Sequence, residues 1–167
     1  MKKIGITGAD GFIGGYLKTC FDGIKIGGNL LARAKIDNFH TIIHCAGRMP
    51  FEGVRNVNFI GDNIFATERL VWLANRAKVK RIIYLSTMAI YTLKMYGLSK
   101  LVGEECLSEF KGEKIIFRLP RVNPFLLDVD FTKNIQKKYF YKEKNIYIAN
   151  YPMITIGELI NFLIKII

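Results

Sequence analysis

The sequence is poor in cysteine and has no long hydrophobic run. Its three cysteines, Cys20, Cys45 and Cys106, lie far apart, with no CxxC pair and no zinc-ligand spacing. This pattern predicts reduced thiols in a cytoplasmic protein. No stretch approaches the roughly 20 apolar residues that a membrane helix needs. The basic start at Met1–Ile4 imitates a signal peptide, but glycines interrupt the apolar run that follows, so we predict no export.

Acidic residues and histidines are also scarce. The 14 acidic residues face 25 lysines and arginines, which gives a net charge of +11. Such an excess fits an acidic ligand, such as a dinucleotide or a sugar nucleotide, or nucleic acid, but we favour a lysine-rich surface that keeps the protein in solution. His40 and His44 are the only histidines, and they have too few partners for a metal site. We expect His44 to be a hydrogen-bonded residue near the core.

The apolar residues indicate strands that alternate with helices. Half of the 167 residues are apolar, which is typical of one globular domain, and we expect residues 1–167 to form it. The predicted strands are residues 3–7, 24–26, 41–45, 81–86 and 114–119. The predicted helices are residues 12–21, 63–78, 96–110 and 156–167. Strands that are apolar throughout and alternate with helices predict an α/β fold with a parallel sheet that helices cover on both faces.

The segment "TGADGFIGG" contains three glycines at intervals of three residues. Gly8, Gly11 and Gly14 come directly after the first strand and open the first helix. In a dinucleotide site one glycine allows a tight turn, one lets the backbone approach a pyrophosphate, and one lets helix and strand pack closely. The free N–H groups of the helix N-terminus then face the phosphates. The segment therefore predicts dinucleotide binding.

This loop resembles the TGxxGxxG loop of the short-chain dehydrogenase/reductase superfamily, in particular its extended branch of sugar-nucleotide epimerases, dehydratases and reductases. Further stretches are similar to that branch: "TIIHCAG", "NIFATERLVWLANRAKVKRIIYLST", "FRLPRV" and "MITIGELINFLIKII". The resemblance implies a Rossmann-like, doubly wound fold that binds NAD or NADP. The cofactor residues that it implies are Gly8, Ala9, Asp10, Gly11, Phe12, Ile13, Gly14, Asn29, Leu30, Cys45, Ala46, Gly47, Asn63, Tyr96, Lys100 and Pro120.

The stretch "LSTMAIYTLKMYGLSK" contains two tyrosines that compete for the role of catalytic acid and base. Tyr96 has Lys100 four residues later, on the same helix face, about 5–6 Å away at Cβ. Tyr91 has no such lysine, and we expect it to line the pocket or to pack. A lysine beside the phenol favours the phenolate and lowers the phenol pKa from about 10. The resemblance implies Thr87 as the hydroxyl that binds the substrate oxygen, with its neighbour Ser86 as the second choice.

The chain is short for the family. Thr87 and Tyr96 are only nine residues apart, residues 123–152 leave a reduced substrate region, and only residues 22–40 separate the first helix from the next long strand. No acidic residue near Gly28 marks a preference for NAD. Arg33 or Lys35 fits the extra phosphate of NADP, but a solvated helix charge is the plainer interpretation.

Three functions remain open from the sequence. The first is an enzyme that transfers hydride to or from a nucleotide-activated sugar, as an epimerase, reductase or dehydratase. The second is a dinucleotide-binding scaffold without catalysis. The third is nucleic-acid binding through "QKKYFYKEKNIYIANY", although we favour the interpretation that this segment forms an edge strand or a lid.

The resemblance also implies a homodimer, with Trp72, Leu98 and Leu101 at the interface, and no membrane partner.

Overall fold

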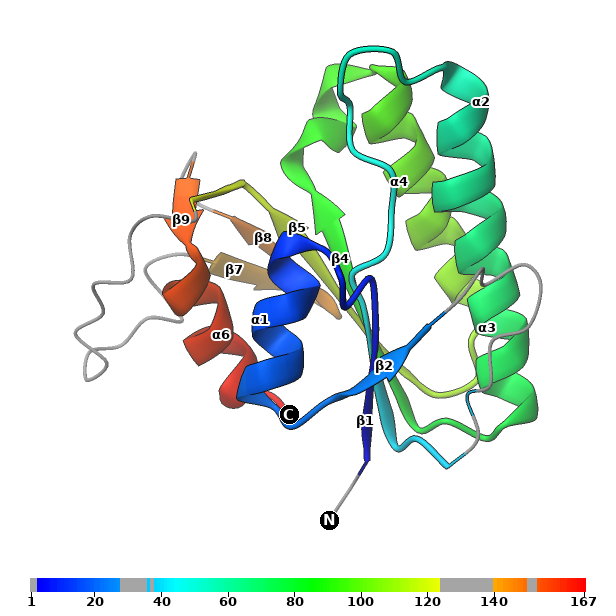
Figure 1. Cartoon of the computed structure of the whole chain (residues 1–167), viewed down its shortest axis with the longest axis vertical. Coiled ribbons are helices and arrows are strands. Elements are labelled where there is room, and N and C mark those ends of the chain that lie inside the picture. The colour runs from blue at the N-terminus through cyan, green and yellow to red at the C-terminus, as the bar shows by residue number, and fades with distance from the viewer. Residues whose placement is uncertain (1–2, 28–35, 37, 124–139, 150–152) are drawn as a thin grey trace.

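The chain folds into a seven-stranded sheet with helices on both faces (Figure 1). The computed structural model describes residues 3–27, 36, 38–123, 140–149 and 153–167. The strands are β1 (Ile4–Thr7), β2 (Ile24–Ile26), β3 (Thr41–His44), β4 (Arg81–Thr87), β5 (Glu113–Leu119), β6 (Arg121–Asn123), β7 (Phe140–Glu143), β8 (Ile146–Ala149) and β9 (Met153–Thr155). The helices are α1 (Phe12–Cys20), α2 (Asn56–Phe59), η1 (Ile60–Phe65), α3 (Ala66–Arg76), η2 (Met88–Thr92), α4 (Met95–Cys106), η3 (Leu107–Glu109) and α6 (Ile156–Ile164).

The strand order is that of a doubly wound sheet. It runs β2-β1-β3-β4-β5-β8-β7, and all neighbours are parallel except β7 and β8. The chain moves outward from β1 to β2 and then returns to place β3 on the other side of β1. Ligands of such sheets bind at the carboxyl ends of the strands, where the direction of winding changes. Here that point lies between β1 and β3, and the predicted Rossmann-like fold is confirmed.

Two layers of apolar side chains hold the helices to the sheet. Helices α1 and α6 pack side by side on one face, whereas α3 and α4 cover the other face (Figure 1). The first layer includes Ile6, Leu17 and Phe162, and the second includes Ile42 and Leu70. Every residue of β3 is buried because helices cover both of its sides. Helix α6 begins with a capping box in which Thr155 and Glu158 satisfy each other's backbone N–H groups.

The second predicted helix begins earlier than expected. Instead of starting at Asn63, helical backbone starts at Asn56 and continues through the π-helical turns of η1 into α3. The sequence hides this start because Phe59 is the only buried residue of α2, so the apolar period appears only from Leu70 onward. The π-helical segment carries Asn63 toward the end of β3, and such widened turns occur often near functional sites.

The C-terminal part adds a small hairpin and a second, two-stranded sheet. Strands β7 and β8 form an antiparallel hairpin at the edge of the main sheet. Within the Lys- and Tyr-rich segment the edge strand is β7, whereas β8, the strand predicted from "NIYIANY", lies between β5 and β7 and is not an edge strand. Strand β6 pairs with β9, so the chain segment after Pro120 is held against the segment before α6. Within the described ranges, no helix is long and apolar enough to cross a membrane.

Candidate active site

A cleft of about 910 Å³ opens at the carboxyl ends of the central strands. Its volume is in the range of small-molecule and cofactor sites. The lining residues are Gly8, Gly11, Phe12, Ile13, Gly14, Cys45, Gly47, Arg48, Met49, Phe51, Leu85, Ser86, Thr87, Met88, Ala89, Tyr96, Lys100, Leu119, Pro120, Arg121 and Val122. The cleft therefore brings together the glycine loop, the end of β4, the first turns of α4 and the end of β5.

The absence of a side chain has a different structural effect at each of the three loop glycines. Gly8 has φ +66°, and a Cβ there would lie 2.7 Å from the backbone nitrogen of Ala46. A Cβ on Gly14 would overlap the carbonyl oxygen of Gly8, so only glycine lets α1 approach the loop this closely. Gly11 differs, because a Cβ there would meet only the Gly8 oxygen, at 3.2 Å, and the residue lines the cleft. The loop thus leaves room for a ligand over Gly11.

The N-terminus of α1 is free to bind an anion. Its N-cap, Gly11, provides no side-chain cap, and the first turn contains no acidic residue. The first N–H groups of a helix have no partner within the helix and carry the positive end of its dipole. Phe12, Ile13 and Gly14 form this first turn and line the cleft. The loop and helix together fit the pyrophosphate of a dinucleotide.

Four of the predicted cofactor residues do not line the cleft. Asp10 points to solvent and forms an ion pair with Lys25, at 2.6 Å. Ala9 and Ala46 support the loop, and the Ala46 N–H donates to the hydroxyl of Thr7. Asn63 is buried behind the lining, where its Oδ1 accepts from the Arg48 N–H and its amide donates to Ser99. Asn29 and Leu30, together with Arg33 and Lys35, lie outside the described residues.

Two side chains at the cleft, the buried His44 and the half-buried Cys45, are kept neutral. His44 is buried, with Nδ1 2.6 Å from the Thr7 hydroxyl and Nε2 3.0 Å from the Thr67 hydroxyl. Burial, and then the charge of Lys100, lowers its pKa to about 3, so it is the hydrogen-bonded core residue that we expected. Burial raises the pKa of Cys45 to about 12, although the nearby Lys100 opposes the rise. Neither side chain therefore supplies a charged nucleophile or base at neutral pH.

Thr87 and Tyr96 lie close together in the cleft. The Thr87 Oγ1 accepts from the Ala89 N–H at 3.1 Å, which leaves its own proton for the hydrogen bond with Tyr96. A side-chain hydrogen bond from Thr87 lowers the pKa of Tyr96, but burial raises it more, so the net pKa lies above its ordinary value. The Tyr96 hydroxyl itself donates to the sulfur of Met49, at 3.3 Å. The two hydroxyls are thus adjacent, as the sequence predicts.

The pKa of Tyr96 lies above its ordinary value rather than below it, contrary to our expectation for a tyrosine one helical turn before Lys100. The Lys100 Nζ lies over the ring of Tyr84, 4.1 Å from the ring centre. Burial lowers the pKa of Lys100 to about 8, against raising contributions from Cys45 and Glu104. The spacing of four residues places both side chains along the cleft, but the ammonium turns toward the aromatic face.

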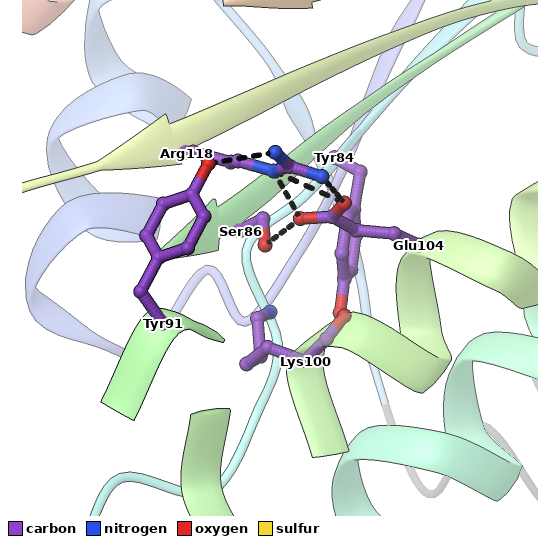
Figure 2. A network of polar contacts seen from close by, with 6 residues as sticks. All are labelled: Tyr84, Ser86, Tyr91, Lys100, Glu104 and Arg118. Atoms are coloured by element: carbon purple, nitrogen blue, oxygen red, sulfur yellow. Dashed lines mark hydrogen bonds and ion pairs between the residues drawn. The ribbon is translucent and has the colours of Figure 1, made fainter. Parts of the chain in front are cut away.

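A buried ion pair joins the strand end to α4 and β5 (Figure 2). The Glu104 carboxylate accepts from the guanidinium of Arg118, at 2.7 Å, and from the hydroxyl of Ser86, at 2.5 Å. Arg118 also donates to the Tyr91 hydroxyl, at 3.0 Å. Ser86 lines the cleft but donates its only proton to Glu104, whereas the Thr87 hydroxyl lies beside Tyr96, which favours Thr87 as the residue that binds the substrate oxygen. Tyr91 is exposed and packs on Arg118 rather than lining the cleft.

Sequence reasoning missed this network and part of the cleft wall. Glu104 lies four residues after Lys100 on the same helix, and this spacing could have indicated that Glu104 lies near the site. The missed lining residues follow predicted ones directly in the chain: Arg48, Met49, Met88, Ala89, Arg121 and Val122. Phe51, Leu85 and Leu119 complete the wall. In the described part of the chain, no group of His, Cys, Asp or Glu side chains could hold a metal ion.

We expect Glu104→Gln to destabilise the fold by about 3 kcal/mol, because breaking a buried ion pair leaves the Arg118 charge without its partner. Urea denaturation measures this free energy of unfolding. The matched control is Glu105→Gln, which removes an exposed carboxylate from the same helix and should change stability by less than about 0.5 kcal/mol. Equal stability of the two variants would contradict a structural role for the pair.

The fold and the cleft define a member of the extended short-chain dehydrogenase/reductase class. Residues 28–121 match the model of a family described as "Polysaccharide biosynthesis protein", and the chain belongs to this family. The resemblance stated from the sequence is therefore confirmed. A comparison with curated protein sequences found no match.

Solved structures share the fold at low sequence identity. MoeE5 in complex with UDP-glucuronic acid and NAD is 18% identical, with a TM-score of 0.74 over 97% of this chain and 71% of that one. A short-chain dehydrogenase/reductase from Agrobacterium tumefaciens with bound NAD is 21% identical, with a TM-score of 0.66 over 73% of this chain and 50% of that one. UDP-glucuronic acid 4-epimerase from Bacillus cereus with NAD is 20% identical, with a TM-score of 0.62 over 81% and 63%. The chain thus spans about half to seven tenths of these structures.

Proposed function

We propose that the chain binds NAD or NADP in the cleft and transfers hydride to or from a nucleotide-activated sugar, as an epimerase or a reductase. The observation that carries this proposal is the meeting, in one cleft, of the glycine loop with Thr87, Tyr96 and Lys100. The similar structures from which the proposal draws its ligands were solved with NAD, and one of them with UDP-glucuronic acid. The three free thiols fit a reducing compartment, so we place the protein in the cytoplasm.

Each of the three proposed catalytic side chains has one task. The nicotinamide, when bound, supplies a carbon that accepts or gives hydride. Thr87 donates its proton to the substrate oxygen, in place of its hydrogen bond with Tyr96, and holds that oxygen in position. Tyr96 moves the proton of the reacting hydroxyl, and Lys100 stabilises the phenolate once its ammonium leaves the Tyr84 ring. With a pKa of about 8, Lys100 carries its positive charge at pH 7.

The cofactor would lie against residues from three segments. Gly8, Gly11 and the first turn of α1 would bind the pyrophosphate, and Cys45 and Gly47 would face the following part of the dinucleotide. Pro120 would border the nicotinamide at the end of β5. We treat residues 1–167 as one cofactor-binding domain, with residues 123–152 as its reduced substrate region.

Calorimetric titration with NAD and with NADP tests the cofactor half of this proposal. Saturable binding of either dinucleotide is the expected result, and the ratio of the two affinities decides which is used. Failure of the folded wild-type protein to bind either one would reject the proposal.

A dinucleotide-binding scaffold without catalysis is the second candidate. The observations that favour it are the contact of the Tyr96 hydroxyl with the Met49 sulfur and the position of the Lys100 ammonium on the Tyr84 ring, because neither group contacts the other. Binding of cofactor without turnover on any nucleotide sugar would support the scaffold.

We also propose a homodimer through α3 and α4. Trp72 and Leu101 are exposed on these helices, Leu98 is half-buried, and a groove lined by Trp72 and Val102 runs between them. The guanidinium groups of Arg69 and Arg76 lie on the Trp72 ring, so a partner helix would pack against this stack.

Light scattering at tens of micromolar should therefore give twice the chain mass of 19.1 kDa. Trp72→Glu should give the monomer mass, because it would bury an unpaired carboxylate at the interface. Lys78→Glu, a charge change just beyond the end of α3, serves as the control and should remain dimeric. A monomeric wild type would contradict the proposed assembly.

A further inference from the structure

The cleft is lined by three basic side chains and, among the described residues, by no carboxylate. The three are Arg48, Lys100 and Arg121. A wall with charge of one sign raises the local concentration of ligands of the opposite sign. A cation that already has a partner within the protein is less available to a ligand.

Two of the three are already engaged. The Arg48 guanidinium contacts the Asp62 carboxylate with two nitrogens, at 2.7 and 2.8 Å. The Lys100 ammonium is buried, lies on the Tyr84 ring and is close to Gly47 on the cleft wall. Arg121 is different, because it is exposed and has no ion-pair or hydrogen-bond partner in the part of the chain that the structure describes.

Arg121 stands on a different wall from the glycine loop. It follows Pro120 at the end of β5, whereas the loop follows β1, and two strands, β3 and β4, separate β1 from β5 in the sheet. Its backbone is fixed because β6 pairs with β9, with Arg121 opposite Met153. Strand pairing thus anchors the backbone of Arg121 at the rim of the cleft that Thr87 and Ala89 also line, and its exposed guanidinium is available to a ligand there.

We infer that Arg121 binds an anionic group of the second ligand, either the diphosphate of a nucleotide sugar or the carboxylate of an acidic sugar. This inference rests on the proposed function, which places the dinucleotide on the glycine loop. The planar guanidinium presents paired donors that match both phosphate and carboxylate oxygens, so one side chain suits both sources. The substrate class is thus a sugar nucleotide that Arg121 selects by charge.

Titration of the NAD-saturated protein with UDP, UDP-glucose and UDP-glucuronate tests this inference. Arg121→Met removes the charge at an exposed position and should preserve the fold. It should weaken binding by about 10- to 100-fold, the usual effect of losing a hydrogen bond to a charged group. Arg121→Lys should recover part of the affinity, because lysine restores the positive charge but not the paired N–H donors of the guanidinium. Lys18→Met, which removes an exposed cation from the last turn of α1, is the matched control.

The three ligands separate the two sources of charge. Equal weakening for all three assigns Arg121 to the diphosphate, and weakening for UDP-glucuronate alone assigns it to the carboxylate. Unchanged binding of all three in Arg121→Met overturns the inference, as does an equal loss of NAD affinity, which would assign Arg121 to the cofactor.

The failure of the proposed function would look different. In that case wild type binds NAD but none of the three uridine ligands. Inorganic pyrophosphate then replaces them as the probe at low salt, where charge pairs are least screened. Pyrophosphate binding that depends on Arg121 would uphold the anion site without the nucleotide sugar. Pyrophosphate binding that does not depend on Arg121, or none at all, would overturn it.

Discussion

Gly11→Val should abolish measurable NAD binding in a protein that still folds. The Gly11 backbone is extended, with φ −83° and ψ 170°, a conformation that valine adopts without strain. The new Cβ would meet only the Gly8 oxygen, at 3.2 Å, so the loop needs to shift by no more than a few tenths of an ångström. The two methyl groups would then occupy the space over the α1 N-terminus that a pyrophosphate needs. Calorimetry with NAD measures the loss, and circular dichroism checks the fold.

Two neighbouring glycines provide controls of opposite kind. At Gly15 a Cβ would lie at an ordinary contact distance of 3.5 Å, so Gly15→Ala should keep NAD affinity. At Gly14 a Cβ would overlap the Gly8 carbonyl oxygen, so Gly14→Ala should destabilise the protein itself. If folded Gly11→Val binds NAD as tightly as wild type, the cofactor does not lie on this loop.

Tyr96→Phe should lower turnover by about 10²–10⁴-fold and leave NAD affinity nearly unchanged. The variant keeps the ring, which packs near Phe59, and removes only the hydroxyl that is proposed to move the proton. The measurement is the rate at which bound nicotinamide is reduced or oxidised in the presence of nucleotide sugars. A loss of this size with intact cofactor binding would separate a chemical role from a structural one.

Tyr91→Phe is the matched variant for this comparison. It also removes one phenolic hydroxyl, but that hydroxyl accepts only from Arg118 on an exposed ring outside the cleft. Its turnover should stay within a few-fold of wild type, since the Glu104–Arg118 pair does not depend on it. An inactive Tyr91→Phe beside an active Tyr96→Phe would show that the chemistry belongs to the other tyrosine.

Local spacing made the glycine loop and the main elements predictable. Gly8, Gly11 and Gly14 follow a buried strand, and this order fixes a turn, a ligand face and a close helix contact within nine residues. The apolar runs of β3, β4 and β5 were equally plain, because a strand covered on both faces needs apolar side chains throughout. The start of the second helix was wrong because α2 and η1 bury too few apolar residues to show a helical period.

The electrostatics of the site depended on contacts that spacing does not show. Lys100 lies one turn after Tyr96, yet its ammonium rests on Tyr84, a residue of β4 that only the packing of α4 on the sheet brings close. The engagement of Ser86 by Glu104 likewise requires the register of three elements. A sequence pattern names the groups that share a helix face, whereas tertiary packing decides which atoms they touch.

Hydride transfer is measured most directly by the absorbance of the nicotinamide after wild-type protein, saturated with NAD, is mixed with UDP-glucose or UDP-glucuronate. We expect reduced nicotinamide to appear, transiently in an epimerase or lastingly in an oxidising enzyme, and we expect Tyr96→Phe to suppress the signal. If only reduction of the sugar is favoured, the same mixture prepared with NADH should lose its reduced nicotinamide absorbance on addition of a keto sugar nucleotide. An unchanged spectrum in every mixture, from a protein that demonstrably binds both the cofactor and the sugar nucleotide, would contradict hydride transfer as the function of this cleft.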